Sequence, residues 1–188
     1  MATGDLTTLA NVKQYSAITI ATDDALLTRM ITALSTFVQT WLNRTIASAP
    51  YVDKINGIGS QRVQFANYPV TAVSSLTIDG QTIPAAPSPI TTFWNGYVFD
   101  AQMIMVQGYC FTRGSQNITI AYTAGFATTP FDIEQAVLEI IDLRYKQRAN
   151  QGYVSKALAG ETVTFDRKDM SASTLTVLQN YRRVAPFV

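Results

Sequence analysis

The stretch TIAYTAGFATTPFDIEQAVLEIIDLRYKQR, residues 119–148, contains a predicted strand, a turn and a long amphipathic helix in succession. Apolar and polar residues alternate in its first part, Gly125 marks a turn, and Pro130 favours a helix start. The predicted buried face of this helix comprises Phe131, Ile133, Ala136, Val137, Ile140, Ile141 and Tyr145. The roughly forty residues that follow have too little apolar periodicity to fold alone. We therefore expect these residues to fold against a partner protein. This expectation favours a role in an assembly over a role as an enzyme.

A second long helix is predicted at residues 22–44. Its apolar residues recur at i, i+3, i+4 and i+7 spacing and form one continuous stripe. The stripe comprises Leu27, Met30, Ile31, Leu34, Phe37, Val38, Trp41 and Leu42. A short helix through Leu9, Val12 and Tyr15 is predicted before it. The stripe needs another apolar surface, and the helix after Pro130 is the simplest candidate.

Between these helices, residues 51–124 show short β-type runs separated by residue pairs that favour tight turns. The pairs are Asn56-Gly57, Asp79-Gly80 and Asn95-Gly96. The clearest strands are residues 70–78 and 117–122, and aromatic residues flank the third turn, which predicts a hairpin at residues 93–99. We interpret this region as a small antiparallel sheet inserted between two helices.

The predicted fold class is α+β and mainly helical: a bundle of two long and two short helices, with an inserted small antiparallel β region and an extended C-terminal arm. Residues 1–149 form the predicted helical core, with the β region at about 51–124. Residues 150–188 form the predicted arm, which contains a final short helix capped by Ser171 or Ser173 and contributes assembly contacts.

Charge is sparse and unevenly distributed. Charged residues make up 14% of the chain, and the formal net charge is +1. Residues 144–188 contain eight Lys or Arg and three Asp or Glu, whereas residues 1–143 contain six and ten. Such asymmetry is compatible with a surface for nucleic acid or an acidic partner, and equally with a solvated helix end and tail. Low charge fits a protein whose surface is largely covered by neighbours.

The residue types needed for most catalytic and metal sites are missing. The sequence contains no histidine and a single cysteine, Cys110, which excludes Ser-His and Cys-His pairs and a zinc cluster. Three acidic pairs remain, Asp23/Asp24, Asp132/Glu134 and Glu139/Asp142, and helix-dipole or surface roles explain them. Gly57-Ile58-Gly59 lacks the Lys-Ser/Thr of a phosphate loop. We expect no catalytic residues, no cofactor, no metal and no membrane span, and hence no enzyme.

The order of elements, together with several short motifs, resembles a known family. The quoted segments are TDDALLTRMITALSTFVQTWLNR (22–44), NYPVTAVSSLTIDG (67–80), residues 118–148 and VLQNYRRV (177–184). The most specific are Asn67-Tyr68-Pro69-Val70, Tyr122-Thr123-Ala124-Gly125 and Tyr181-Arg182-Arg183. Over residues 6–184 the chain resembles the head–tail connector (adaptor) proteins of long-tailed bacteriophages.

This resemblance implies a structural virion protein of the neck, made in the host cytoplasm, that forms a ring of twelve copies beneath the portal protein. The ring extends the channel for genomic DNA, without sequence-specific binding, and docks the next neck or tail protein. The resemblance also assigns portal or subunit contacts to the arm. The corresponding residues are Tyr153, Lys156, Phe165, Leu175, Leu178, Tyr181, Arg182, Arg183 and Phe187. The alternatives are another neck or tail-completion protein, a stopper or terminator, and a nucleic-acid-binding module that uses the basic C-terminal quarter.

Overall fold

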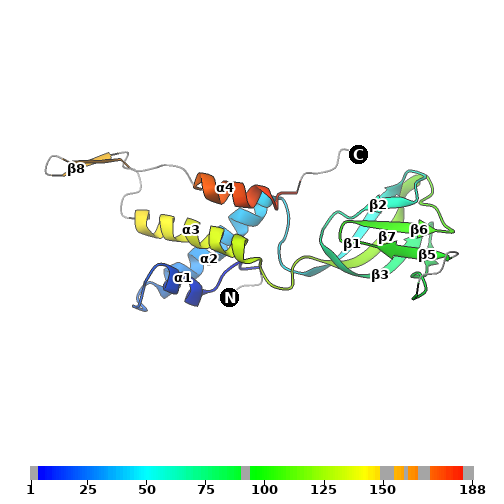
Figure 1. Ribbon diagram of the computed structural model, residues 1–188, viewed down its shortest axis with the longest axis horizontal. Coiled ribbons are helices and arrows are strands. Elements are labelled where there is room, and N and C mark those ends of the chain that lie inside the picture. The colour runs from blue at the N-terminus through cyan, green and yellow to red at the C-terminus, as the bar shows by residue number, and fades with distance from the viewer. Residues whose placement is uncertain (1–3, 90–93, 149–154, 159–160, 165–169, 184–188) are drawn as a thin grey trace. The chain divides into compact units, whose positions relative to one another are not determined.

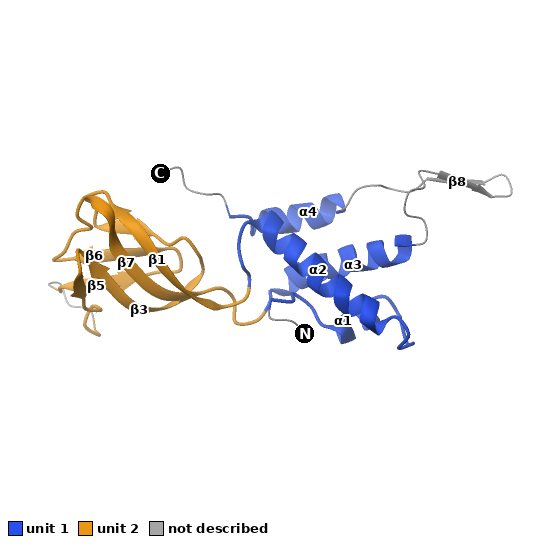
Figure 2. Ribbon diagram, turned by 180° about the vertical axis from the view of Figure 1, so that it is seen from behind, with its two compact units in different colours: residues 1–46, 129–188 blue, residues 47–128 orange. Residues whose placement is uncertain are grey.

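The chain divides into two compact units. The computed structural model describes residues 4–89, 94–148, 155–158, 161–164 and 170–183 (Figure 1). One unit consists of Met1–Ile46 with Thr129–Val188, and the other of Ala47–Thr128 (Figure 2). We call them the helical unit and the sheet unit.

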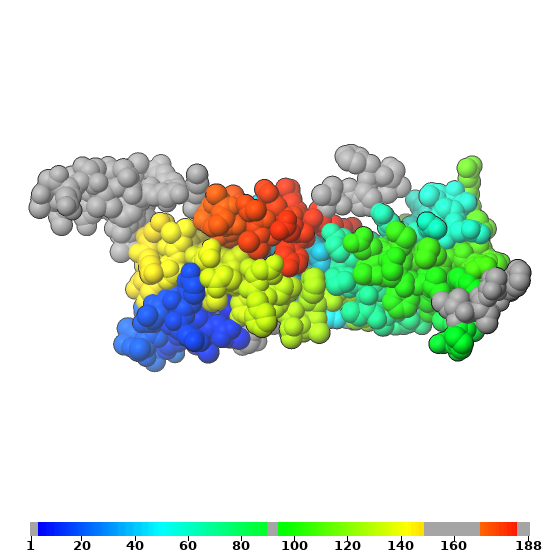
Figure 3. Space-filling model, viewed as in Figure 1, coloured from blue at the N-terminus to red at the C-terminus, as the bar shows by residue number. Residues whose placement is uncertain are grey.

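The helical unit contains four helices within its described residues. They are α1 (Leu9–Tyr15), α2 (Asp24–Leu42), α3 (Phe131–Gln147) and α4 (Ala172–Gln179). Helix α3 lies between α1 and α4, and α2 packs across its other side (Figures 1 and 2). In the space-filling view, α3 (yellow) reaches the surface between α1 (blue) and α4 (orange to red) (Figure 3).

The core of this unit forms where α2 meets α3. The buried positions of α2 are Leu27, Ile31, Leu34, Ser35, Val38 and Leu42. Those of α3 are Ile133, Ala136, Val137, Leu138, Ile140 and Ile141. Both long helices are confirmed, because their apolar residues repeat at helical spacing and meet each other. Ser171 caps α4 as predicted, with its Oγ accepting from the Thr174 N–H at 3.1 Å.

Two antiparallel sheets build the sheet unit. The four-stranded sheet has the order β1 (Ala49–Gly57), β7 (Gly114–Ala124), β3 (Val70–Ile78), β4 (Gln81–Ile83). The three-stranded sheet has the order β2 (Arg62–Gln64), β6 (Met103–Gln107), β5 (Gly96–Phe99). Strand β7 is central because it pairs with both β1 and β3.

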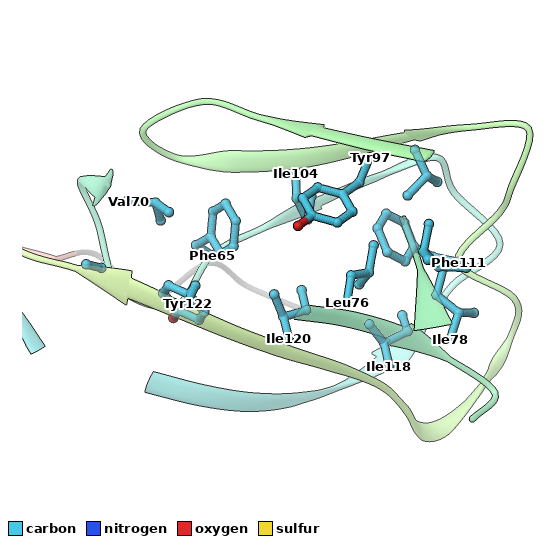
Figure 4. Packing of buried hydrophobic residues seen from close by; sticks show 13 residues of the cluster. Phe65, Val70, Leu76, Ile78, Tyr97, Ile104, Phe111, Ile118, Ile120 and Tyr122 are labelled. Atoms are coloured by element: carbon cyan, nitrogen blue, oxygen red, sulfur yellow. The ribbon is translucent and has the colours of Figure 1, made fainter. Parts of the chain in front are cut away.

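A single apolar core lies between the two sheets (Figure 4). Alternate residues of β7 point into it, namely Ile118, Ile120, Tyr122 and Ala124. Across from them lie Phe65, Tyr97 and Ile104, and Phe111 packs near Leu76 and Ile78 (Figure 4). Full burial of each large apolar side chain contributes about 1.5–3 kcal/mol relative to exposure, so this cluster is the main source of stability of the unit.

Of the three predicted turns, only Asp79-Gly80 is confirmed. It joins β3 to β4, and both residues have positive φ, 51° and 80°. Gly57 instead ends β1, where a Cβ would lie 1.7 Å from the Thr112 carbonyl oxygen. Gly96 begins β5, where a Cβ would lie 2.5 Å from the Pro84 carbonyl oxygen. Asn-Gly pairs therefore mark close backbone approaches at these two positions, not turns.

The expectation of a mainly helical bundle is wrong. About 32% of the described residues are in strands, and the fold is a sheet-rich α+β fold with four helices in the same part of the chain. The sheet unit has a core of its own and is not a small insert. Pairs such as Ala49 with Ala124 join residues far apart in the chain. Local periodicity cannot reveal such pairing, which depends on cross-strand packing.

Part of the segment 150–170, expected to be an extended arm or loop, has regular structure. Strands β8 (Ser155–Leu158) and β9 (Glu161–Thr164) pair antiparallel, with Ser155 opposite Thr164. The backbone of this hairpin is described, and its side chains lie outside the described part of the chain.

Candidate assembly surfaces

Glu134 of α3 holds the N-terminal segment and α1 in place. Its Oε1 accepts hydrogen bonds from Thr7 Oγ1 at 3.0 Å and from Asn11 Nδ2 at 2.6 Å. Nearby, the Leu6 N–H donates to Ser35 Oγ at 3.0 Å in a buried contact with α2. Hydrogen bonds to a carboxylate are stronger than neutral ones, so Glu134 fixes the position of α1 on α3.

Two other acidic side chains of α3 hold the C-terminal helix. Glu139 Oε2 accepts from Thr174 Oγ1 at 2.9 Å, and Asp132 Oδ2 accepts from Tyr181 OH at 2.7 Å. The hydrogen bond to Asp132 raises the pKa of Tyr181. Asp132, Glu134 and Glu139 thus each bind a neighbouring segment of the helical unit, and this geometry supports a structural role.

Asp23, before α2, binds the far end of α3. Its carboxylate accepts from Tyr145 OH and from Arg148 Nη2, the latter at 3.3 Å. The hydrogen bond to Asp23 raises the pKa of Tyr145. Asp23 therefore joins the start of one long helix to the end of the other and does not cap its own helix.

Several described cations of the basic C-terminal quarter contact their own unit. Arg144 lies over the Phe37 ring at 5.5 Å, and Arg182 lies over the Trp41 ring at 5.2 Å, both measured to the ring centroid. Lys146 Nζ pairs with Asp142 Oδ2 at 2.8 Å. These distances are within the range of cation–π and ion-pair contacts. Much of the charge that suggested a nucleic-acid surface therefore has a partner inside the unit.

The predicted contact residues differ in how far the structure exposes them. Leu178 is fully buried, while Leu175, Tyr181 and Arg183 are half-buried and only Arg182 is exposed. The Arg183 N–H donates to the Leu42 carbonyl oxygen at 2.9 Å, which fastens the chain after α4 to the end of α2. Lys156 belongs to β8, of which only the backbone is described. Tyr153, Phe165 and Phe187 lie outside the described residues.

An open groove lies between α1 and α3 in the helical unit. Its volume is about 350 Å³. We call it the α3 groove, and its lining comprises Asn11, Gln14, Tyr15, Phe131, Glu134, Gln135 and Leu138. Beyond Tyr15 the surface continues into a second hollow of about 230 Å³ that is bounded by α3 and the start of α4. An uncovered strip of α3 thus runs between its two neighbouring helices (Figure 3).

Phe131 is the residue that sequence reasoning misplaced. Helical spacing assigned it to the buried face of α3, yet 88% of it is exposed at the edge of the α3 groove. Helical periodicity does not reveal whether a neighbouring element covers the first turn. An exposed large apolar side chain beside a groove indicates an interaction surface when other apolar groups line the same groove, and Tyr15 and Leu138 do so here.

Two of the three most specific motifs of the resemblance meet in the sheet unit. The Asn67 N–H donates to Tyr122 OH at 3.1 Å, across 55 residues of sequence. The Gly125 N–H donates to the Pro69 carbonyl oxygen at 2.9 Å, and Val70 lies opposite Ala124 in the β3–β7 pairing. These motifs therefore form a clasp that holds the loop before β3 against the end of β7.

Tyr122 is the centre of this clasp. It is 1% exposed, and its hydroxyl donates to Asp53 Oδ2 while it accepts from Asn67. Burial, followed by the hydrogen bond to Asp53, raises the pKa of Tyr122 to about 12. A buried phenol that keeps its proton and bridges two segments stabilises the fold.

Among the described residues, no three His, Cys, Asp or Glu side chains are grouped closely enough to hold a metal ion. None of the described helices combines the length and apolar character needed to cross a membrane. The polar groups of the described sites instead make contacts between segments.

Comparison with known proteins connects this architecture to a family. Residues 5–184 match the model of the family described as head completion protein. This chain belongs to the head completion protein family. The match confirms the resemblance to head–tail connector proteins and the expected virion location. It also confirms the non-enzymatic class, since the family consists of structural virion proteins. No curated protein matches the sequence.

Solved structures share the fold over the whole chain. One is described as the virion of the native gene transfer agent (GTA) particle, with a TM-score of 0.60 and 16% identity. Two others are the neck of the empty GTA particle computed with C6 symmetry (TM-score 0.58, 16% identity) and the neck of the native GTA particle computed with C12 symmetry (TM-score 0.58, 14% identity). Each alignment covers 100% of this chain and 94% of the other.

Proposed function

We propose that this head completion protein is a ring-forming subunit of the virion neck, placed beneath the portal protein. The ring extends the DNA channel and presents the docking face for the next neck or tail protein. The observation that carries the proposal is the family match over residues 5–184. Whole-chain similarity to proteins of GTA necks, one of them solved with C12 symmetry, supports a ring of twelve copies.

The distribution of charge supports a covered subunit. Residues 47–128 contain three Lys or Arg and three Asp or Glu, so the sheet unit has no net charge and few charged groups. A sparsely charged surface suits contact with neighbours in a closed ring. The partners of the proposal are other copies of the chain, the portal protein, a downstream neck protein and genomic DNA that passes without sequence-specific binding.

The internal contacts of Arg144, Lys146 and Arg182 also favour a conduit over a nucleic-acid-binding module. Tight phosphate binding depends on Lys and Arg side chains that are available to DNA. Cations that lie over aromatic rings or pair with Asp are partly committed within the protein. We therefore consider the nucleic-acid-binding module a weaker alternative to the neck subunit as the function of this protein.

The proposal is tested with portal-bearing heads that lack a tail. The purified protein is added to these heads, and co-sedimentation and averaged electron micrographs report its binding. We expect a ring of density at the portal vertex, with heads that lack the portal as the control. Binding only after another neck protein has been added would support the stopper or terminator position. Strong, salt-sensitive binding to free DNA without binding to heads would favour the nucleic-acid module.

A further inference from the structure

The outer face of α2 lacks the charges of an ordinary solvent-exposed helix face. The exposed residues of α2 are Ala25, Leu26, Thr28, Arg29, Ala33, Thr36 and Thr40. Arg29 is the one charged residue among them. The hydroxyls of Thr28, Thr36 and Thr40 donate to backbone carbonyl oxygens one turn earlier at 2.8–2.9 Å, so they are satisfied within the helix. An exposed helix face normally carries many charges, and small, weakly polar residues instead suit packing against another helix.

On the other side of the helical unit, α3 exposes a strip between α1 and α4. We call it the α3 strip. Its members line the α3 groove and the second hollow, and they are Phe131, Gln135, Leu138, Asp142 and Lys146. Phe131 is 88% exposed at the N-terminal end of the strip. A large apolar side chain left in water forgoes most of its favourable transfer free energy, so this end of the strip gains from being covered.

The second hollow, at the C-terminal end of the α3 strip, has an excess of negative charge. Its lining contains two carboxylates, Glu139 and Asp142, and one ammonium group, that of Lys146. Lys146 Nζ pairs with Asp142 Oδ2 at 2.8 Å, whereas Asp142 Oδ1 is buried and has no hydrogen-bond partner among the described residues. Tyr15 and Met170 add apolar walls. Such a hollow suits a long cationic side chain, whose stem packs on the walls while its head meets the carboxylates.

Arg29 has this chemistry, but it cannot enter the second hollow of its own chain. It is exposed and makes no ion pair with the described residues. It lies two residues from Leu27 and two from Ile31, which are both buried, so at about 100° per residue it points away from α3. The hollow lies on the far side of α3. Two helices, each about 10 Å wide, therefore separate Arg29 from the hollow, and the cation must come from another copy.

The two faces also match along their length. Within the unit α2 and α3 run antiparallel, since Asp23 joins the start of α2 to the end of α3. Rotation about an axis along these helices keeps that orientation between copies. With Arg29 opposite Asp142, the position eleven residues further along α2 is Thr40. It faces the position eleven residues earlier on α3, which is Phe131. One alignment thus brings the cation of the α2 face to the negative hollow and small residues over the exposed ring.

We propose that the outer face of α2 in one copy packs on the α3 strip of the next copy, with Arg29 in the second hollow beside Glu139 and Asp142. The inference rests on the ring of the proposed function and names one of its subunit contacts. Each copy carries both faces on opposite sides of its helical unit, which is what a head-to-tail contact needs to close a ring.

Cysteine cross-linking tests the contact and its alignment. In a Cys110→Ser background, one copy carries Leu26→Cys or Thr40→Cys, and a second copy with a tag of different size carries Lys146→Cys or Phe131→Cys. Under mild oxidation, the matched pairs Leu26 with Lys146 and Thr40 with Phe131 should give heterodimer bands at least tenfold stronger than the two crossed pairs. The crossed pairs are matched controls, because Leu26 and Thr40 are exposed on the same face but about 21 Å apart at 1.5 Å per residue. Each mixture is oxidised in solution and on portal-bearing heads.

Absence of the heterodimer bands would overturn the inference, and so would bands of equal strength for matched and crossed pairs. A cross-link from the α3 strip to the portal or to another neck protein, in place of a second copy, would overturn it as well. Ring density on heads without the matched bands leaves the neck function intact. Failure of the wild-type protein to bind heads would instead count against the proposed function.

A double-mutant cycle gives a second readout. Arg29→Ala and Asp142→Asn each remove one side of the charge pair, and each should raise the concentration needed for self-assembly by about tenfold or more. The double variant should lose little more than either single variant, because the two side chains share one contact. Arg62→Ala, an exposed position of the sheet unit, is the control, and thermal unfolding checks that each variant is folded. Additive losses, or an equal loss in the control, would contradict the pairing.

Discussion

The sheet unit and the helical unit are held together by different forces. In the sheet unit an apolar core between two sheets dominates, and residues 47–128 contain six of the 27 charged side chains of the protein. The helical unit also has an apolar core, but four carboxylates bind the segments around α3 to one another. The comparison shows that the low charge of the protein belongs mainly to the sheet unit. In the helical unit, acidic side chains hold neighbouring segments together.

The largest expected effect is in the core of the sheet unit. Phe111 is fully buried, and Phe111→Ala should lower the free energy of unfolding of this unit by about 3–5 kcal/mol, because it leaves a cavity between the sheets. Hydrogen exchange followed by mass spectrometry reads the two units separately. We expect faster exchange in β3, β6 and β7 and little change in α2 and α3. Equal loosening of both units would show that they unfold together.

Leu178→Ala addresses the helical unit. Leu178 is completely buried, with 0% of its surface exposed to water. Its truncation should therefore destabilise this unit by about 2–5 kcal/mol. Thermal unfolding monitored by helix circular dichroism measures the effect, with exposed Gln179→Ala as the control. A stability unchanged from wild type would support the predicted separable arm at residues 150–188. The expected loss would assign α4 to the helical core.

Tyr122→Phe tests how the stability of the sheet unit depends on pH. The pKa of Tyr122 is raised from 10.0 to about 12 in the folded protein, so its contribution is complete below pH 10 and is lost as the pH rises toward 12. Wild-type protein should therefore lose stability in the sheet unit over this range, and the variant should lose less. At neutral pH the variant should be about 1 kcal/mol less stable, because the hydrogen bonds to Asp53 and Asn67 are removed. Denaturant unfolding at pH 8 and pH 11 checks both effects.

The smallest expected effect concerns one carboxylate contact of the helical unit. Thr174→Val keeps the shape of the side chain but removes the donor to Glu139, which should reduce stability by about 0.5–1.5 kcal/mol. Thr176→Val is the matched control, since the Thr176 hydroxyl donates only to the Ala172 carbonyl oxygen of its own helix. Thermal unfolding of the two variants gives the comparison. A larger loss in the control would indicate that helix propensity, not the contact with α3, controls the stability of α4.

Some features of the fold could be predicted from local sequence. The stripes of α2 and α3, the strand at residues 70–78 and the turn at Asp79-Gly80 depend on residues close together in the chain. The size of the sheet unit could not be predicted in this way. Its core joins strands whose partners lie far apart in the chain, and local patterns do not reveal such pairing.

The candidate surfaces follow the same division. The α3 groove could not be predicted from the sequence, because it requires α1 to lie beside α3. Leu178 was predicted as a contact residue from its place in the arm, yet it is buried in its own unit. Phe131 was predicted as buried from helical spacing, yet it is exposed. In both cases the neighbouring element decides exposure, and the sequence does not specify that neighbour.

By itself, the sequence determined the absence of histidine chemistry, the two long helices and the order of elements that identifies the family, because composition and helical periodicity are local properties. Only the tertiary structure decided that residues 119–148 begin as the central strand of a sheet and end as the middle helix of another unit. It also decided that Asn67 would meet Tyr122 and that Glu134, Glu139 and Asp132 would bind neighbouring segments. These contacts join residues distant in sequence, and their free energies depend on packing and burial that exist only in the folded chain.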